Sequence, residues 1–286
     1  MYKRNAFIIG IVKMSKLWEN DLKCPIVLSF DLDGVSGVIN RDPNSRKYPS
    51  LMSMRDFGPQ VATPRILDLL DRHEIKATFY VPGFIAETNM NLIKTIANKG
   101  HEIGHHGYMH EPPATLTELE ESEILDRGSK ILKDISGAAP IGYRSPSWEL
   151  SQYSVKLLKE KGFYYDSSLM GNDIPYLVET GVGPLIEIPV HWELDDHPYF
   201  NYIPFLGQTN VISNPQNVYE SWKYAFDGLY KYERSFILTM HPWIIGRAGR
   251  LTILDNLIQH IKSHSGTEFL TAAGLARLFE NSNSVN

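Results

Sequence analysis

Cysteine is nearly absent from this chain of 286 residues, with Cys24 as the single example. One thiol cannot form an internal disulfide or a metal cluster of thiolates, which excludes a disulfide scaffold and a cysteine-rich zinc module. Long apolar runs are also absent, so the sequence predicts no membrane span. The formal net charge of -5 provides no general attraction to nucleic acid or to an anionic membrane. We therefore expect neither as a partner.

The composition that remains is that of a globular enzyme, because 43% hydrophobic and 21% charged residues can bury a large core. The apolar run after Lys3 and Arg4 imitates an export signal, but it is short, Lys13 closes it and no A-x-A cleavage site follows. We treat residues 1–24 as an N-terminal extension, in which Met14 is a second candidate start. A cytoplasmic location is the expectation, and the lone cysteine is compatible with a reducing compartment.

Short apolar runs alternate with segments of helical period from residue 25 onward. We expect strands at residues 26–30, 75–81, 102–104, 163–165, 185–190 and 235–240. A polar loop extends to about residue 61, and helices are expected from 64, at 91–99, at 115–137, at 151–162, at 218–232, at 251–264 and after 271. Thr115 and Glu118 have the spacing of a capping box. No linker interrupts the pattern, which predicts one α/β domain over 25–280 and a tail at 281–286.

Chemically reactive side chains follow strand after strand in this pattern. They are Asp31, Asp33, His106, His110, Arg144, Asp166 and His241. A (β/α) barrel assembles its active site at the carboxyl ends of its strands. An open doubly wound sheet would normally place a glycine-rich phosphate loop after its first strand, and SFDLDG is not one. The distribution therefore favours a single barrel.

His106 and His110 are spaced so that both imidazoles can reach one ion. Alone, such a pair is more often structural or exposed, and Gly107 weakens a helical interpretation. Asp33 strengthens the hypothesis, because two imidazoles and one carboxylate leave an open position for water. Asp31 lies two residues before Asp33, so on extended backbone both side chains point the same way. One carboxylate would then bind the metal while the other accepts a proton, with capping of local amides as the alternative.

Five motifs in order, SFDLDG, HEIGHHGYMH, YRSPSWE, YDSS and LTMHP, resemble those of the polysaccharide deacetylase family, the carbohydrate esterase 4 type. The resemblance extends over residues 26–279. It implies a distorted TIM-like barrel of seven strands and hydrolysis of carbon-nitrogen bonds, often the N-acetyl group of a sugar. It also implies a divalent metal held by Asp33, His106 and His110. Zinc is the first expectation, and manganese, iron and cobalt accept the same nitrogen and oxygen ligands.

The same resemblance implies the catalytic roles. Asp31 is the base that activates water, Arg144 holds that base in its ionised form, and His241 is the general acid for the departing nitrogen. Asp166 is expected to orient His241, with Asp173 as a competing candidate and simple capping as the alternative for Asp166.

Two tryptophans complete the predicted site. The metal and a backbone N–H near Trp148 would hold the oxyanion, and Trp148 and Trp192 would line a partly apolar pocket. Aromatic residues at such positions more often serve packing, and sugar clefts use them too.

Leu32 separates two aspartates that are adjacent in the extracellular sugar deacetylases, and a long segment at residues 45–67 precedes the first helix. Both features resemble an intracellular branch with cyclic imide hydrolases, allantoinase-like proteins and peptidoglycan deacetylase-like proteins. This implies a small-molecule substrate, a cyclic imide or related cyclic amide first and an N-acetyl sugar or peptidoglycan second. It also implies a homo-oligomer, a tetramer in related members.

Two other classes of function compete. Two histidines and one carboxylate also form the metal triad of mononuclear iron oxygenases, although their usual scaffold is all-β. A barrel that binds a ligand without catalysis is the other alternative, and the complete set of acid, base and metal-ligand residues argues against it.

Overall fold

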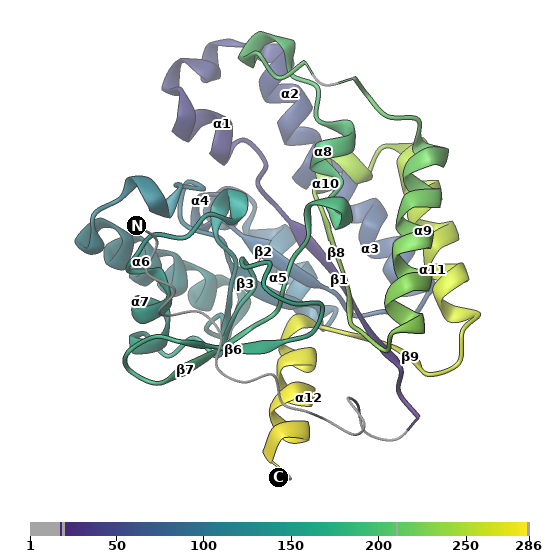
Figure 1. Ribbon diagram of the computed structural model, residues 1–286. Helices are drawn as coiled ribbons and strands as arrows, with labels where there is room; N and C mark the ends of the chain where they lie inside the picture. The colour runs from purple at the N-terminus through teal and green to yellow at the C-terminus, as the bar shows by residue number, and fades with distance from the viewer. Residues whose placement is uncertain (1–17, 19–20, 210, 285–286) are drawn as a thin grey trace, which may run out of the picture.

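The computed structural model describes residue 18 and residues 21–209 and 211–284, and within these ranges nine strands form one curled sheet (Figure 1). The strands are β1 (Cys24–Asp31), β2 (Thr78–Val81), β3 (Glu102–His105), β4 (Gly142–Tyr143), β5 (Tyr165–Asp166), β6 (Tyr176–Glu179), β7 (Pro184–Glu187), β8 (Phe236–Met240) and β9 (Thr267–Leu270). Most of the predicted N-terminal extension, residues 1–17, 19 and 20, lies outside the described residues.

The strand order is β6-β7-β5-β4-β3-β2-β1-β8, with β9 also paired to β1. All pairings are parallel except that of β6 with β7. The strands from β7 to β8 are thus the seven parallel strands of the predicted barrel, and β6 and β9 are additions. Between the described edge strands β6 and β8 there is no pairing, so the sheet is a half-barrel. The prediction of a single α/β domain with a distorted TIM-like barrel is confirmed.

Strand β1 lies next to the edge strand β8 in this order and is buried along its whole length. It pairs with β8 on one edge, and with β9 and then β2 on the other, from Cys24 opposite Thr267 to Asp31 opposite Tyr80. Successive side chains point to opposite faces, and both faces are covered, which explains its nearly continuous apolar sequence. The strand ends at Asp31, so the first predicted site residue lies at its carboxyl end.

Twelve helices connect or cover these strands in the described part of the chain. They are α1 (Ser36–Arg41), α2 (Pro49–Phe57), α3 (Thr63–Arg72), α4 (Gly83–Thr88), α5 (Met90–Asn98), α6 (Glu118–Ser136), α7 (Ser154–Glu160), α8 (His197–Phe200), α9 (Pro215–Lys231), α10 (Pro242–Ile245), α11 (Ala248–Lys262) and α12 (Ala272–Ser284). None of the described helices is long and apolar enough to cross a membrane. In Figure 1, α1 and α2 lie at the end toward which β1 runs, and α12 lies at the opposite end.

Three expectations about these helices were wrong. The polar loop expected before α3 contains α1 and α2, which begin without any side-chain cap. The capping box of α6 is formed by Thr117 and Glu120, since the predicted Thr115 belongs to a 3-10 turn. Helix α12 extends to Ser284, so the predicted tail boundary at residue 280 falls inside a helix.

The short strand β4 depends on a close approach between Gly142 and the ring of Tyr165. The Tyr165 hydroxyl donates to Glu102 Oε1 at 2.9 Å and accepts from the Tyr80 hydroxyl at 3.1 Å, which fixes the ring in the interior. A Cβ atom on Gly142 would lie only 2.0 Å from Tyr165 Cζ. The pairing of β4 with β5 therefore requires glycine at this position.

We predict that Gly142→Ala lowers the free energy of unfolding by about 1 to 3 kcal/mol, because the added methyl overpacks a buried ring that cannot swing away. Urea denaturation of the purified variant measures this change. Gly228→Ala is the matched control, since its Cβ would meet nothing within 4 Å and it lies within α9. That control should stabilise the protein by about 0.5 to 1 kcal/mol. Wild-type stability for Gly142→Ala would contradict the packing described.

Candidate active site

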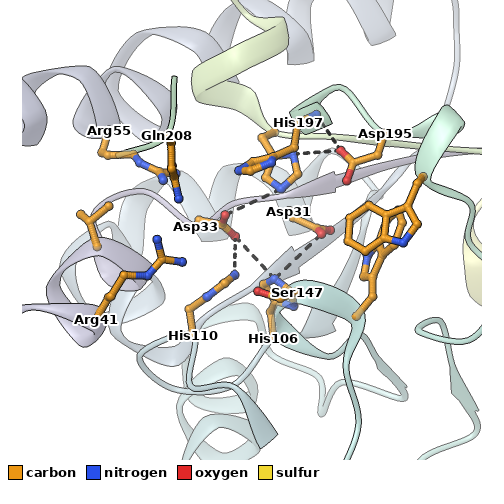
Figure 2. A pocket seen from close by; sticks show the side chains of 15 residues that line it. Asp31, Asp33, Arg41, Arg55, His106, His110, Ser147, Asp195, His197 and Gln208 are labelled. Atoms are coloured by element: carbon orange, nitrogen blue, oxygen red, sulfur yellow. Dashed lines mark hydrogen bonds and ion pairs between the residues drawn. The ribbon is translucent and has the colours of Figure 1, made fainter. Parts of the chain in front are cut away.

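The carboxyl ends of the parallel strands open into one pocket, which encloses about 710 Å³ with its open mouth included (Figure 2). Seven of the nine predicted site residues line it, namely Asp31, Asp33, His106, His110, Trp148, Trp192 and His241. Arg144 is buried behind Asp31 and contacts it directly. Asp166, the remaining predicted residue, does not line the pocket.

Asp33, His106 and His110 form a group that fits a divalent metal. Asp33 Oδ1 lies 3.5 Å from His106 Nε2 and 3.7 Å from His110 Nε2. This carboxylate oxygen is buried and accepts no hydrogen bond, which is costly unless a cation compensates it. Two imidazoles and one carboxylate match the donors that zinc, manganese, iron and cobalt accept. The predicted ligand set therefore converges on one point.

The backbone explains how these ligands meet. Leu32 is buried between Asp31 and Asp33 and donates its N–H to the Tyr80 carbonyl, so the two carboxylates leave the strand end on the same side. His110 has a positive φ of 63° in a tight loop, not a helix. Glu111 closes that loop by accepting the Tyr108 N–H at 2.9 Å.

His106 is held in the orientation that a ligand needs. Its Nδ1 lies 2.7 Å from the carbonyl oxygen of Arg144 and donates to it. The tautomer that makes this bond leaves the Nε2 lone pair free on the side of Asp33, where a metal ion can accept it, and metal-binding histidines commonly donate their other N–H to such a carbonyl.

Arg144 fixes Asp31. Its Nη1 donates to Asp31 Oδ1 and to Ser29 Oγ, both at 2.9 Å, while its Nε and Nη2 donate to Ser167. The guanidinium also lies 4.1 Å from the centre of the Tyr80 ring. Asp31 Oδ2 stays on the pocket side, 3.9 Å from His106 Nε2. The fully buried cation thus holds Asp31 as an anion with one oxygen available as a proton acceptor.

His241 is oriented by Asp196, and the prediction that Asp166 orients it was wrong. Asp196 Oδ1 lies 2.7 Å from His241 Nδ1, and both carboxylate oxygens of Asp196 accept the His241 backbone N–H. Asp195 is a further carboxylate, 3.5 Å from the same Nδ1. Burial lowers the pKa of His241, but Asp195, Asp196 and Asp33 outweigh it and raise that pKa to about 10. His241 is therefore a cation near neutral pH, with Nε2–H toward the pocket.

Asp166 instead supports the segment that binds Arg144. Its Oδ1 accepts from Ser168 Oγ at 2.7 Å, and that hydroxyl accepts the backbone N–H of Ser145. Burial raises the pKa of Asp166 to about 6, and its carboxyl pairs with that of Glu187. The competing candidate Asp173 does not reach His241 either, because its carbonyl accepts from Ser235 at the start of β8, far from the carboxyl end.

The two predicted tryptophans form one aromatic wall. The rings of Trp148 and Trp192 lie 4.4 Å apart between centroids, and Trp148 is buried while Trp192 is 47% exposed at the rim. The Trp148 N–H donates to the Ser145 carbonyl at 3.0 Å. The backbone amide of Trp148 itself is therefore engaged, the oxyanion donor near Trp148 stays a prediction, and the indole lines the pocket as expected.

Six further residues with charged, imidazole or amide side chains belong to the site and lie outside the predicted set. Asp196 orients His241, and the others line the pocket, namely Arg41, Arg55, Asp195, His197 and Gln208. The adjacent acids in WELDDHP, shortly after an expected strand, were the one available signal for Asp195 and Asp196. The two arginines belong to α1 and α2, in the region for which the sequence predicts a polar loop.

Together these groups can activate water and protonate a leaving group on opposite sides of one metal position. Asp31 is an anionic base held by Arg144, and His241 is a cationic acid held by Asp196. Their protonation states suit hydrolysis, in which a base accepts a proton from water and an acid donates one to the departing atom. Asp33 Oδ2 lies 3.8 Å from His241 Nε2, so the acid is adjacent to the ligand group.

Comparison with known proteins shows the family and the fold of this chain. The family model described as polysaccharide deacetylase matches residues 44–165. A protein named peptidoglycan deacetylase from Helicobacter pylori is 32% identical over 86% of this chain and 92% of its own length. A crystal structure classed with the polysaccharide deacetylases, from Mycobacterium smegmatis, is 35% identical, with a TM-score of 0.90 over 93% of both chains. The Puue allantoinase structure, at 22% identity and a TM-score of 0.82 over 93% of both chains, shares the fold.

We predict that the protein binds one zinc ion per chain through Asp33, His106 and His110. His106→Ala removes a ligand, so it should weaken zinc binding at least about 100-fold in isothermal titration calorimetry. Asp31→Asn should retain the ion, since Asp31 contacts Arg144 and is not a ligand.

The control is a second group with metal-type donors, namely Asp227 on α9, His260 on α11 and His264 just after α11. His264→Ala should leave zinc affinity at the wild-type value. Loss of binding in His264→Ala with normal binding in His106→Ala would place the ion outside the pocket and overturn the assignment.

Proposed function

Because the chain belongs to the polysaccharide deacetylase family, whose members hydrolyse carbon-nitrogen bonds other than peptide bonds, we propose that it is a metal-dependent amidohydrolase that opens a small cyclic imide or related cyclic amide. The observation that carries this proposal is the pairing described above. An anionic Asp31 and a cationic His241 flank one three-residue ligand group in a single pocket.

In the proposed reaction, Asp31 Oδ2 accepts a proton from the water that attacks the carbonyl carbon. Arg144 keeps the other oxygen engaged, so the base retains one fixed direction. His241 Nε2–H then protonates the nitrogen as the carbon-nitrogen bond breaks, while Asp196 stabilises the imidazolium before this transfer. A metal bound to Asp33, His106 and His110 would supply Lewis acidity, which polarises the carbonyl and makes water easier to deprotonate.

The shape of the pocket favours a small substrate. Val38 and Arg41 of α1 and Arg55 of α2 stand on one side of the ligand group, and the tryptophan wall is also part of the lining. Side chains from these two helices therefore occupy part of the pocket wall. The shared fold with an allantoinase structure shows that this scaffold also occurs in a ureide hydrolase. A cytoplasmic location and a homo-oligomer, a tetramer first, remain part of the proposal.

N-deacetylation of an N-acetyl sugar or of peptidoglycan is the second candidate. The similarity to the Helicobacter pylori peptidoglycan deacetylase supports it. Trp192, half-exposed at the rim, offers a flat surface on which a sugar ring can stack. The iron oxygenase alternative has no support from the family assignment.

We predict that the zinc-loaded protein opens succinimide or a dihydropyrimidine with a higher kcat/KM than it deacetylates N-acetylglucosamine oligomers. A small ring fits inside the pocket, whereas a polymer must extend beyond its mouth. A panel of imides, ureides and acetylated sugars, assayed with and without a chelator, measures the ranking. Asp31→Asn is the matched control and should abolish turnover of the preferred substrate. Faster deacetylation of the sugars would replace the imide proposal by the second candidate.

The Asp196 contact predicts a pH effect. His241 acts as an acid in its protonated form, so activity should fall as pH rises through its pKa, which the neighbouring carboxylates raise to about 10. Asp196→Asn removes one negative charge, so the basic limb of the pH–kcat profile should move to lower pH by about 1 to 3 units.

Asp227→Asn is the control for this change, since Asp227 forms a pair with His260 at the same 2.7 Å separation outside the pocket. Its profile should match the wild type. An unchanged basic limb in Asp196→Asn would show that His241 is not the acid.

A further inference from the structure

One side of the pocket carries positive charge that the hydrolysis mechanism does not use. Arg41, Arg55 and Gln208 lie together on the side of Asp33 away from Asp31 and Asp195 (Figure 2). Arg41 ends α1, Arg55 lies in the last turn of α2, and Gln208 follows the 3-10 turn Pro204–Leu206. Three segments distant in sequence thus place donor groups on one wall.

Arg55 is the strongest element of this wall because it is buried and forms no ion pair with a carboxylate of the described residues. It is only 8% exposed, and its Nε is buried without a hydrogen-bond acceptor. Its guanidinium stacks on the Trp243 ring, with Arg55 Cζ 4.0 Å from the ring centre. Burial and the nearby Arg41 lower the pKa of Arg55 to about 10, so the group is still charged at neutral pH. Buried arginines are normally paired with anions, and this one faces the pocket instead.

The other two groups add donors at the same place. Arg41 is exposed and forms no ion pair with any described residue. Gln208 accepts a hydrogen bond at its Oε1 from Asn201 Nδ2 at 2.9 Å, which orients the amide and leaves its Nε2 as a donor. All three residues therefore offer N–H groups to the pocket, and none offers a free acceptor.

The nearest carboxylate cannot neutralise this wall. Asp33 is the acid whose charge acts on Arg55, and its oxygen belongs to the metal ligand group. Once Asp33 serves as a ligand, two guanidinium groups and one amide remain for the substrate. A planar carboxylate matches a guanidinium with paired N–H donors, and such charge-assisted bonds are about twice as strong as neutral ones.

We propose that Arg55, Arg41 and Gln208 form a subsite for a carboxylate group on the substrate, so that the enzyme selects an anionic imide or amide over its neutral analogue. This inference rests on the proposed function and names the substrate class within it. A neutral ligand in the same place would keep Arg55 desolvated and unpaired, which disfavours its binding. The arginines act on binding and specificity, whereas Asp31 and His241 act on the bond that breaks.

The first test compares matched substrates with the zinc-loaded enzyme. The pairs are succinimide with its ring-carboxylated analogue, and N-acetylglucosamine with N-acetylmuramic acid, which adds a carboxylate. In the wild type, the anionic member of the productive pair should have the higher kcat/KM. Arg55→Met should lower kcat/KM for that member about 10- to 100-fold, chiefly through KM, and change the neutral member less than about 3-fold. Arg41→Met, at an exposed position, should give a smaller loss of the same kind.

Arg247→Met is the control, because Arg247 stacks on Phe57 at 3.7 Å in the same way as Arg55 on Trp243, but outside this pocket. Its kcat/KM for the anionic and for the neutral substrate should equal the wild-type values. Equal losses for the anionic and neutral members in Arg55→Met and Arg41→Met would overturn the proposal.

A binding measurement separates this inference from the proposed reaction. Succinate and butyrate each bring one carboxylate to the metal, and only succinate has a second one for the arginines. Calorimetric titration of the zinc-loaded protein should show tighter binding of succinate, and Arg55→Met should remove that advantage. Equal affinities in the wild type would overturn the carboxylate subsite even if imides are substrates. A succinate advantage without any imide turnover would instead retain the subsite and remove the proposed reaction.

Discussion

The ion pair between Arg144 and Asp31 is the interaction on which the rest of the site depends. Arg144 is fully buried, and its side chain joins Ser29 and Asp31 of β1 to Ser167 beyond β5. Its carbonyl oxygen also holds His106 in the tautomer that a ligand requires. One residue thus connects the base, one metal ligand and two strands of the sheet. Removing one partner of a buried pair costs about 3 to 5 kcal/mol, so changes at Arg144 affect stability and chemistry together.

Two ion pairs flank the metal-ligand group, one in which a cation holds the base and one in which an anion holds the acid. On one side, a buried cation keeps Asp31 anionic. On the other side, Asp196 keeps His241 cationic, and this pair belongs to the loop after β7 and to the end of β8. An isolated β-bridge joins Asp195 to Thr239 of β8 at the open edge of the half-barrel. This bridge brings Asp196 next to His241, so the acid lies across the ligand group from the base. The protonation states of both groups are therefore set before a substrate binds.

The central residues could be predicted because they directly follow strands with clear apolar patterns. Asp33, His106 and His241 lie within a few residues of β1, β3 and β8, so sheet topology alone brings them together. The partner of His241 could not be predicted in the same way. Asp196 lies between residues 188 and 209, a segment of turns and the four-residue helix α8, where no periodicity in the sequence predicts which way a side chain points. Asp166 follows β5 as expected, but its side chain supports Ser168 and not the pocket. Helices α1 and α2 could not be predicted, because short helices that begin without a side-chain cap leave little signal in the sequence.

The unpredicted helices α1 and α2 bear on which substrate binds, whereas the predicted residues bear on which bond breaks. The motifs that resemble the family position the base, the acid and the ligands, and these groups act on an amide bond in any substrate. In the proposed carboxylate subsite, Arg55 of α2 contacts the rest of the substrate and not the bond that breaks. A sugar contributes hydroxyl groups, which accept hydrogen bonds but leave the buried charge uncompensated, whereas a carboxylate satisfies both the charge and the N–H groups. The electrostatic requirement of one buried guanidinium therefore favours an anionic substrate over a neutral one.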